Sequence, residues 1–199
     1  MGNDDTAYTI SGTQTATGTV GNVTTIGNDT TGTVTASIGS LSAADINTNL
    51  STAATDAITI ETTSTTTTAA ILNALDGKTA TAVDADAITA ITGGIAAGAT
   101  MAGASGLTLK SDYTFGATDA ATTTALVGNV ATIAADTAGV VTASITAGGS
   151  LTAAQINSNL STDSSGDSLT VTLAAATVAA TDITGIDGKT ATAVVADNV

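Results

Sequence analysis

The sequence predicts a mainly β protein with short helices, built as a parallel β(/α) solenoid from two repeats. Three observations predict it: long phrases occur twice, β-like segments recur at the spacing of solenoid coils, and large side chains are scarce. Aromatic residues are only 2% of the chain, whereas a rounded core normally depends on bulky aliphatic and aromatic side chains. A thin, repetitive layer of Val, Ile, Leu and Ala is therefore expected. Two antiparallel β-sandwich modules are the alternative.

Two long blocks of sequence each appear twice. Residues 20–38 match residues 127–145, and residues 41–52 match residues 151–162. The blocks return after about 105–110 residues, and self-similarity at a fixed period is the signature of repeat architectures. The chain is therefore expected to consist of two such repeats.

The duplication also sets the expected domain boundaries. Repeat one is assigned to residues 1–105, and repeat two, incomplete at its C-terminal end, to residues 106–199. The phrase Asp-Gly-Lys-Thr-Ala-Thr-Ala-Val lies at residues 76–83 and again at residues 187–194. We expect the same local structure at both places.

Short β-like segments recur along the whole chain. Each is rich in Thr, Val and Ile, and several alternate between apolar and polar residues, as half-buried strands do. They occupy residues 8–10, 33–38, 57–61, 79–83, 107–115, 140–145, 168–173 and 190–195. Their spacing is too long for hairpin turns and close to that of one solenoid coil. Strands joined in this way require parallel pairing and right-handed crossovers.

Short helices are expected in the connections. Ser42, Thr68 and Thr152 each precede apolar residues at helical spacing, and their hydroxyl groups can cap a helix N-terminus. Gly77 and Gly188 follow where a left-handed residue would stop such a helix.

One stretch of the chain has a sequence pattern that resembles a known type of repeat. Residues 68–93 combine a Thr-rich strand, a Leu-Asn-Ala-Leu-Asp-Gly helix end, a Val-Asp-Ala strand and a Thr-Gly turn. This pattern resembles the Thr/Ala-rich tandem repeats of very large cell-surface and secreted proteins of marine cyanobacteria, most clearly over residues 68–93 and 181–198. The resemblance implies an extracellular adhesive or structural role and carries no catalytic residues. The second copy departs from it at residues 184–186, which makes its helix doubtful.

The charge balance excludes several partners. The chain carries 17 acidic residues against three basic ones and no His, which gives a net charge of −14. Nucleic acids and anionic membranes both attract clusters of Lys and Arg, and the chain has no such cluster. No nucleic acid partner is expected, whereas an acidic surface suits an extracellular or cell-surface protein.

Membrane insertion and enzyme chemistry are not expected either. The long uncharged run between Asp86 and Lys110 is rich in Gly, Ala, Thr and Ser, and holds too few strongly apolar residues for a spanning helix. The chain has no His and no Cys, so the usual general base and thiol nucleophile are missing. Glu61 is the only Glu, and no second carboxylate is paired with it in the sequence.

Carboxylates at alternate positions suggest a calcium site. Asp163, Ser165 and Asp167 present oxygen ligands at the spacing that hard cations favour, and Asp84 and Asp86 form a second cluster. A solvated acidic loop is the alternative interpretation of both. Ca²⁺ is therefore a candidate cofactor.

Two lysines occupy the same place in the two copies of the repeated phrase. Lys78 and Lys189 both follow an Asp-Gly pair. They suggest an intramolecular isopeptide crosslink to an Asn or Asp. The alternative is a solvated charge near a helix C-terminus, where cations are favoured.

These observations favour an extracellular structural or adhesive repeat protein. Its second repeat stops partway and has no polar cap, so a matching surface on another copy can continue the array. Head-to-tail self-association into a filament or surface layer is therefore expected. The alternative is a Ca²⁺-dependent adhesin module that binds glycans or surfaces.

Overall fold

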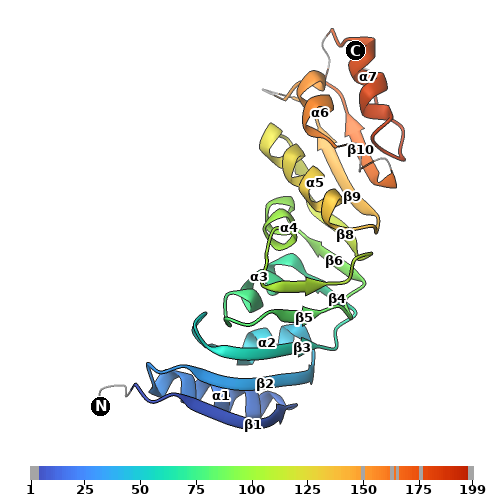
Figure 1. Cartoon of the computed structure of the whole chain (residues 1–199). Helices are drawn as coiled ribbons and strands as arrows, with labels where there is room; N and C mark the ends of the chain where they lie inside the picture. The colour runs from blue at the N-terminus through green and yellow to red at the C-terminus, as the bar shows by residue number, and fades with distance from the viewer. Residues whose placement is uncertain (1–4, 149–150, 162–163, 165, 175–176, 197–199) are drawn as a thin grey trace. The chain divides into compact units, whose positions relative to one another are not determined.

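In the computed structural model of the chain, the described residues are 5–148, 151–161, 164, 166–174 and 177–196. Over these residues the chain forms an α/β protein with seven helices and two five-stranded sheets (Figure 1). Every pairing recorded between its strands is parallel. The chain divides into two compact units, residues 1–89 with 104–110 and residues 90–103 with 111–199.

The first unit alternates strands and helices. Its elements are β1 (Tyr8–Gln14), α1 (Thr17–Asp29), β2 (Val34–Leu41), α2 (Ala43–Asn49), β3 (Ala57–Thr62), β4 (Thr66–Thr68), α3 (Ala69–Asp76), β5 (Val83–Ala85) and β7 (Leu107–Leu109). The first sheet has the strand order β1-β2-β3-β5-β7.

The second unit follows the same alternation. Its elements are β6 (Ala90–Gly93), α4 (Ile95–Ala102), β8 (Thr114–Ala121), α5 (Thr124–Asp136), β9 (Val141–Thr146), α6 (Ala153–Asn159), β10 (Ser168–Thr172) and α7 (Ala180–Asp187). The second sheet has the strand order β10-β9-β8-β6-β4.

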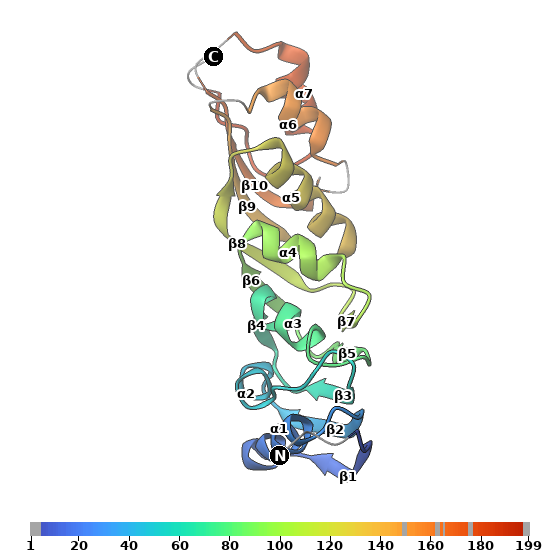
Figure 2. The same cartoon turned by 90° about the vertical axis from the view of Figure 1, so that its left-hand side faces the viewer.

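Each unit has a layer of strands covered by a layer of helices (Figure 2). Strand β9 alternates strictly, with Val141, Ala143 and Ile145 buried and the residues between them exposed. In the first unit, Val20 and Val23 of α1 belong to the same buried cluster as the inward residues of β2 and β3. The core is therefore a thin and mostly aliphatic layer between strands and helices, as the composition indicates, with Tyr113 and Phe115 as buried aromatic residues.

The expected fold class is wrong. Helices follow most of the strands, so the chain is α/β and not mainly β, and its parallel sheets exclude the antiparallel sandwich pair. The parallel pairing itself was expected. Residues 17–29 and 124–136 were not expected to be helical, since Thr, Val and Gly are weak helix formers. Burial of one apolar face against the sheet outweighs that low propensity. The division into repeats, residues 1–105 and 106–199, concerns sequence duplication and stays a prediction.

The helix starts are confirmed, and the helix stops differ. The hydroxyls of Ser42, Thr68 and Thr152 each accept a hydrogen bond from a backbone N–H in the first turn of α2, α3 and α6. Gly77 and Gly188 do end α3 and α7, but with φ near −70° they are right-handed. The left-handed stop was therefore a wrong expectation. The doubtful second helix is present as α7.

Threonine hydroxyls complete the hydrogen bonding where strands begin. The hydroxyl of Thr79 accepts from the backbone N–H of Ile58 at 3.0 Å and lies 2.6 Å from its carbonyl oxygen. Thr190 makes the same two contacts to Leu169, at 3.1 Å and 3.0 Å. The duplicated phrase thus positions a hydroxyl against the neighbouring strand in both units.

Candidate functional site

A lysine contacts an asparagine side chain at equivalent places in the two units. Lys78 Nζ donates to the backbone carbonyl of Asn47 and, at 2.8 Å, to its Oδ1. Lys189 Nζ donates to the backbone carbonyl of Asn157 and, at 3.2 Å, to its Oδ1. We refer to these contacts as the first and second Lys–Asn clamps.

Helix ends position both clamps. Each lysine follows the glycine that ends α3 or α7, and each asparagine lies in the last turn of α2 or α6. The carbonyl groups of a helix C-terminus lack partners within the helix and carry partial negative charge, so an ammonium group is stabilised there. Each clamp therefore fastens one helix to the end of its neighbour.

The first clamp lies in a partly desolvated place. Lys78 is half-buried, and burial lowers the pKa of its ammonium group from the usual value. Lys78 therefore loses its proton more readily than a fully exposed lysine does.

A carboxylate joins the second clamp. Asn157 Nδ2 donates to Asp182 Oδ1 at 3.2 Å, so the amide lies between an ammonium group on one side and a carboxylate on the other. Asp182 lies in the first turn of α7. Counting back from the duplicated phrase by the same number of residues, Ile71 takes its place in the first unit.

A glycine gives the Asn157 side chain its room. A Cβ at Gly185 would lie 2.5 Å from Asn157 Oδ1 and 2.8 Å from its Cγ. Real Cβ atoms essentially never approach so closely, so an alanine here would displace the amide. The equivalent residue of the first unit is Ala74. The second clamp therefore has two features that the first clamp lacks: a carboxylate bonded to the amide, and a glycine that lets the neighbouring helix approach the amide closely.

A cavity of about 360 Å³ opens beside Asp182. Its lining includes the apolar Leu151 and Leu173 and the hydroxyl side chains of Thr152 and Thr177. Small molecules can therefore reach the Asp182 carboxylate through this cavity.

Two other carboxylates act within the sheets. Asp56 Oδ1 accepts from the backbone N–H of Val34 at 2.8 Å, and Asp167 Oδ1 accepts from Val141 at 2.8 Å. Burial raises the pKa of Asp167, while the hydrogen bond from Val141 opposes that shift. Both carboxylates therefore have a structural role, because each binds the backbone N–H at the start of a neighbouring strand.

The pair Tyr113 and Asp136 is also structural. Tyr113 is fully buried and its hydroxyl donates to Asp136 Oδ2 at 2.9 Å. Burial and the neighbouring carboxylate both raise the pKa of the phenol. It therefore remains a protonated donor that ties the end of α5 to the start of β8.

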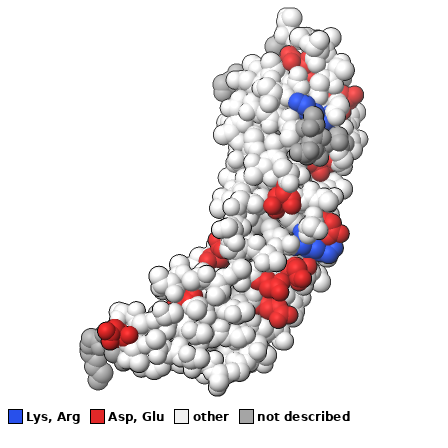
Figure 3. Space-filling model, in the orientation of Figure 1, with Lys and Arg blue, Asp and Glu red and all other residues white. Residues whose placement is uncertain are grey.

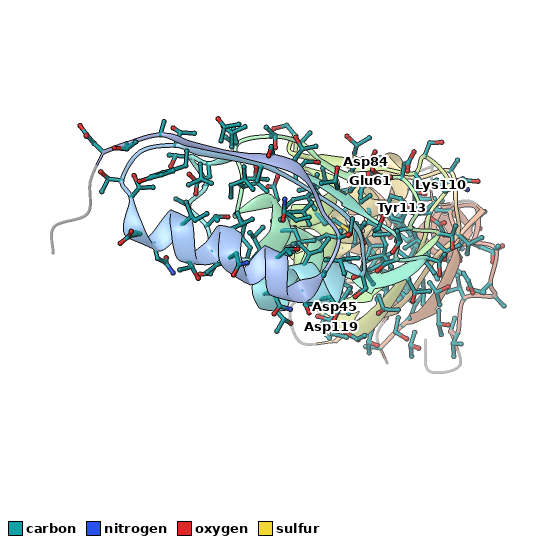
Figure 4. The ribbon with its side chains drawn as sticks, turned by 90° about the horizontal axis from the view of Figure 1, so that it is seen from below. Asp45, Glu61, Asp84, Lys110, Tyr113 and Asp119 are labelled. Atoms are coloured by element: carbon teal, nitrogen blue, oxygen red, sulfur yellow. The ribbon has the colours of Figure 1, made fainter. Side chains whose placement is uncertain are left out.

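The outward face of the first sheet carries two neighbouring acids. Glu61 and Asp84 are partners in the register of β3 and β5, and both project from the face opposite the buried Ile60 and Val83 (Figure 4). Asp84 Oδ1 also accepts from the backbone N–H of Asp86 at 3.2 Å. Uncharged residues make up most of the molecular face shown in Figure 3.

The two clusters predicted to bind calcium belong to different units. Asp84 and Asp86 belong to the first unit and Asp167 to the second, whereas Asp163 and Ser165 lie outside the described residues. Over the described part of the chain, no group of three or more His, Cys, Asp or Glu side chains is close enough to hold a metal. The calcium site stays a prediction.

Sequence reasoning found the lysines and missed their partners. Asn47 and Asn157 lie inside a duplicated Ile-Asn-x-Asn-Leu phrase, so the joint duplication of Lys and Asn was an available signal. Asp182 and Gly185 belong to no duplicated phrase, and nothing in the sequence singles them out.

Comparison with known proteins adds no assignment: no protein-family model, curated protein or solved structure matches the chain. The resemblance to cyanobacterial surface repeats therefore stays a prediction. Of the helices in the described residues, none has both the length and the apolar character needed to cross a membrane.

Proposed function

We propose that the protein is an extracellular structural or adhesive repeat protein whose copies associate head to tail through free sheet edges. One observation carries the proposal. Of the large hydrophobic side chains in the described residues, only Tyr8, Val140 and Val195 are exposed, and Tyr8 and Val195 lie at sheet edges with exposed fractions of 39% each.

The first edge is strand β1. It is the end strand of the first sheet and pairs with β2 along one side, where the Tyr8 N–H donates to the Thr33 carbonyl. In a parallel ladder, successive residues direct their backbone groups to opposite sides, so Thr9 directs its own outward. Strand β1 contains no charged residue and no proline to discourage pairing.

The second edge lies beyond β10. Val195 bridges to Thr172 and exchanges backbone hydrogen bonds with Val171 and Leu173. By the repeat alignment this segment corresponds to β5, which pairs with β7 on its far side in the first unit. Over the described residues, no strand pairs with the far side of the Val195 segment.

The two edges suit each other. Both are uncharged, both carry one exposed apolar side chain, and both belong to parallel ladders. Edge-to-edge pairing of β1 with the Val195 segment of the next copy would add backbone hydrogen bonds and bury Tyr8 and Val195. A contact of this heterologous kind propagates into a filament unless its rotation closes a ring.

The charge and the lack of cysteine support an extracellular location. The chain is strongly acidic and contains no Cys that would depend on the redox state of its surroundings. Shape and repeated pairing, rather than catalysis, would then supply the adhesive or structural role.

Substitution at Thr9 tests the proposal. Thr9→Pro removes an outward N–H and leaves the inward hydrogen bond of Tyr8 in place, so it should abolish assembly without unfolding the sheet. Thr9→Val is the matched control, because it keeps the N–H and suits a strand. Light scattering and electron microscopy at high concentration should show assemblies of the unaltered chain and of Thr9→Val. If the unaltered chain, Thr9→Val and Thr9→Pro are all monomeric at high concentration, the proposal is wrong.

A further inference from the structure

We propose that Lys189 and Asn157 form an intramolecular isopeptide bond, with Asp182 carrying the protons. The Nζ of Lys189 attacks Cγ of Asn157, a C–N bond forms, and the bond from Cγ to Nδ2 breaks. Two of the three protons of the Lys189 ammonium group pass by way of Asp182 to Nδ2, which leaves as ammonium. The reaction needs no oxidant, reductant, water or cofactor.

The three groups lie in the order that the reaction needs. Lys189 Nζ is 3.2 Å from Asn157 Oδ1, and Cγ is one bond further. On the other side of the amide, Nδ2 is 3.2 Å from Asp182 Oδ1. The nucleophile therefore faces the carbonyl, and the carboxylate contacts the nitrogen that has to leave. Holding reactants together in this way replaces a collision with an intramolecular step.

Asp182 supplies what an amine nucleophile lacks. A lysine ammonium group is not nucleophilic until a base removes a proton, and an amide nitrogen is a poor leaving group until it gains one. Once Nζ has added to Cγ, it and Nδ2 are bonded to the same carbon, so the carboxylate that contacts Nδ2 can accept protons from Nζ and pass them to Nδ2. The cavity beside Asp182 offers the released ammonium a way out.

Gly185 is independent support for a site built around this amide. The backbone of α7 approaches Asn157 so closely that a larger residue at position 185 would displace the amide, and that approach also brings Asp182 into reach. A clamp that served only to fasten helix ends would not need it, because the first clamp forms with Ala74 in the same place.

The first clamp serves as the internal control. Lys78 Nζ lies 2.8 Å from Asn47 Oδ1, closer than in the second clamp. The residue in the place of Asp182 is Ile71, which cannot transfer a proton. The first clamp is therefore expected to stay non-covalent, and one bond per chain is expected. This proposal does not depend on self-association.

Intact-mass spectrometry of the full chain tests the proposal directly. The unaltered protein should be lighter than its sequence by one ammonia, and a peptide map should show Lys189 joined to Asn157. The mass deficit should disappear in Lys189→Arg and in Asp182→Asn, and should persist in Lys78→Arg. Gly185→Ala, which displaces the amide, should reduce the crosslinked fraction.

Two outcomes overturn the proposal. One is an unaltered chain whose mass equals that of its sequence, a result that needs no variant to fold. The other is an ammonia loss that persists in Lys189→Arg, because Asn157 would then be cyclising on its own backbone. A deficit of two ammonia molecules would contradict the role given to Asp182, since the first clamp has no carboxylate there.

Discussion

The carboxylate of Asp167 accepts a hydrogen bond of 2.8 Å from the backbone N–H of Val141 at the start of strand β9. Asp56 does the same for Val34 at the start of β2, and its second oxygen accepts from Ala53 at 3.1 Å. Asp167 Oδ2, in contrast, is buried and has no hydrogen-bond partner among the residues that the structure describes. Within those residues, both oxygens of the capping carboxylate accept hydrogen bonds in the first unit, and only one does in the second.

Removal of the first of these carboxylates should be costly. Asp56→Ala leaves the buried N–H of Val34 without its acceptor, which costs about 1–3 kcal/mol, whereas the N–H of the exposed Ala53 can bind water instead. We expect the free energy of unfolding to fall by about that amount in urea titrations. Asp29→Ala, at an exposed position, is the control and should change it by less than about 0.5 kcal/mol. Equal effects of the two substitutions would contradict the strand-capping role.

Asp167 should make the stability depend on pH in a definite direction. Burial raises its pKa in the folded state, so the folded protein holds this proton more tightly than the unfolded chain does. The contribution to stability is therefore present below the unfolded pKa and is lost as the pH rises through the raised folded pKa.

Asp167→Asn checks this sign. The substitution keeps an oxygen for the Val141 N–H and removes the titrating proton. Urea titrations over the acidic range should show that the difference in unfolding free energy between the two chains favours Asp167→Asn increasingly as the pH rises. A difference that stays constant with pH would show that Asp167 does not titrate in the folded state as expected.

The neighbouring acids Glu61 and Asp84 should repel each other. Like charges directly opposite on adjacent strands are destabilising, and pairs of this kind are worth about 0.2–1 kcal/mol. Glu61→Gln should therefore raise the free energy of unfolding by roughly that amount in calcium-free buffer of low ionic strength. The gain should shrink as salt is added.

A second variant, Asp84→Asn, tests the calcium prediction at Asp84 and Asp86. An ion held by these two carboxylates would raise the melting temperature of the unaltered chain more than that of Asp84→Asn. An equal response of both chains to added Ca²⁺ would contradict a calcium site at this place.

Features with a local cause could be predicted from the sequence. The spacing of the β-like segments indicated parallel pairing, and the caps at Ser42, Thr68 and Thr152 were visible because an N-cap depends on one hydroxyl and the next turn. Helices α1 and α5 were not visible, because their Thr, Val and Gly residues become helical only through packing on the sheet. The phrase at residues 79–83 was expected to be a strand, yet only Val83 lies in β5, since Thr79 turns its hydroxyl back to Ile58.

The candidate site shows the same limit. Lys78 and Lys189 stood out because they are duplicated, whereas Asp182 and Gly185 gain significance only when α7 packs against α6. The distance between Asn157 and Asp182 is a property of helix packing, and no pattern in the sequence encodes it directly.

Two glycines in the helices of the second unit should respond oppositely to alanine. A Cβ at Gly98 of α4 would lie 2.5 Å from the ring of the buried Phe115 and 2.8 Å from Ile133, so Gly98→Ala overpacks the core. Overpacking typically costs about 1–3 kcal/mol, which exceeds the gain of about 1 kcal/mol in helix propensity. Gly128 of α5 has nothing within 4 Å of that position, so Gly128→Ala should stabilise the protein by about 0.5–1 kcal/mol. Thermal and urea unfolding of the two variants measure both effects. Stabilisation by Gly98→Ala would mean that α4 does not approach Phe115 as closely as the packing of this unit requires.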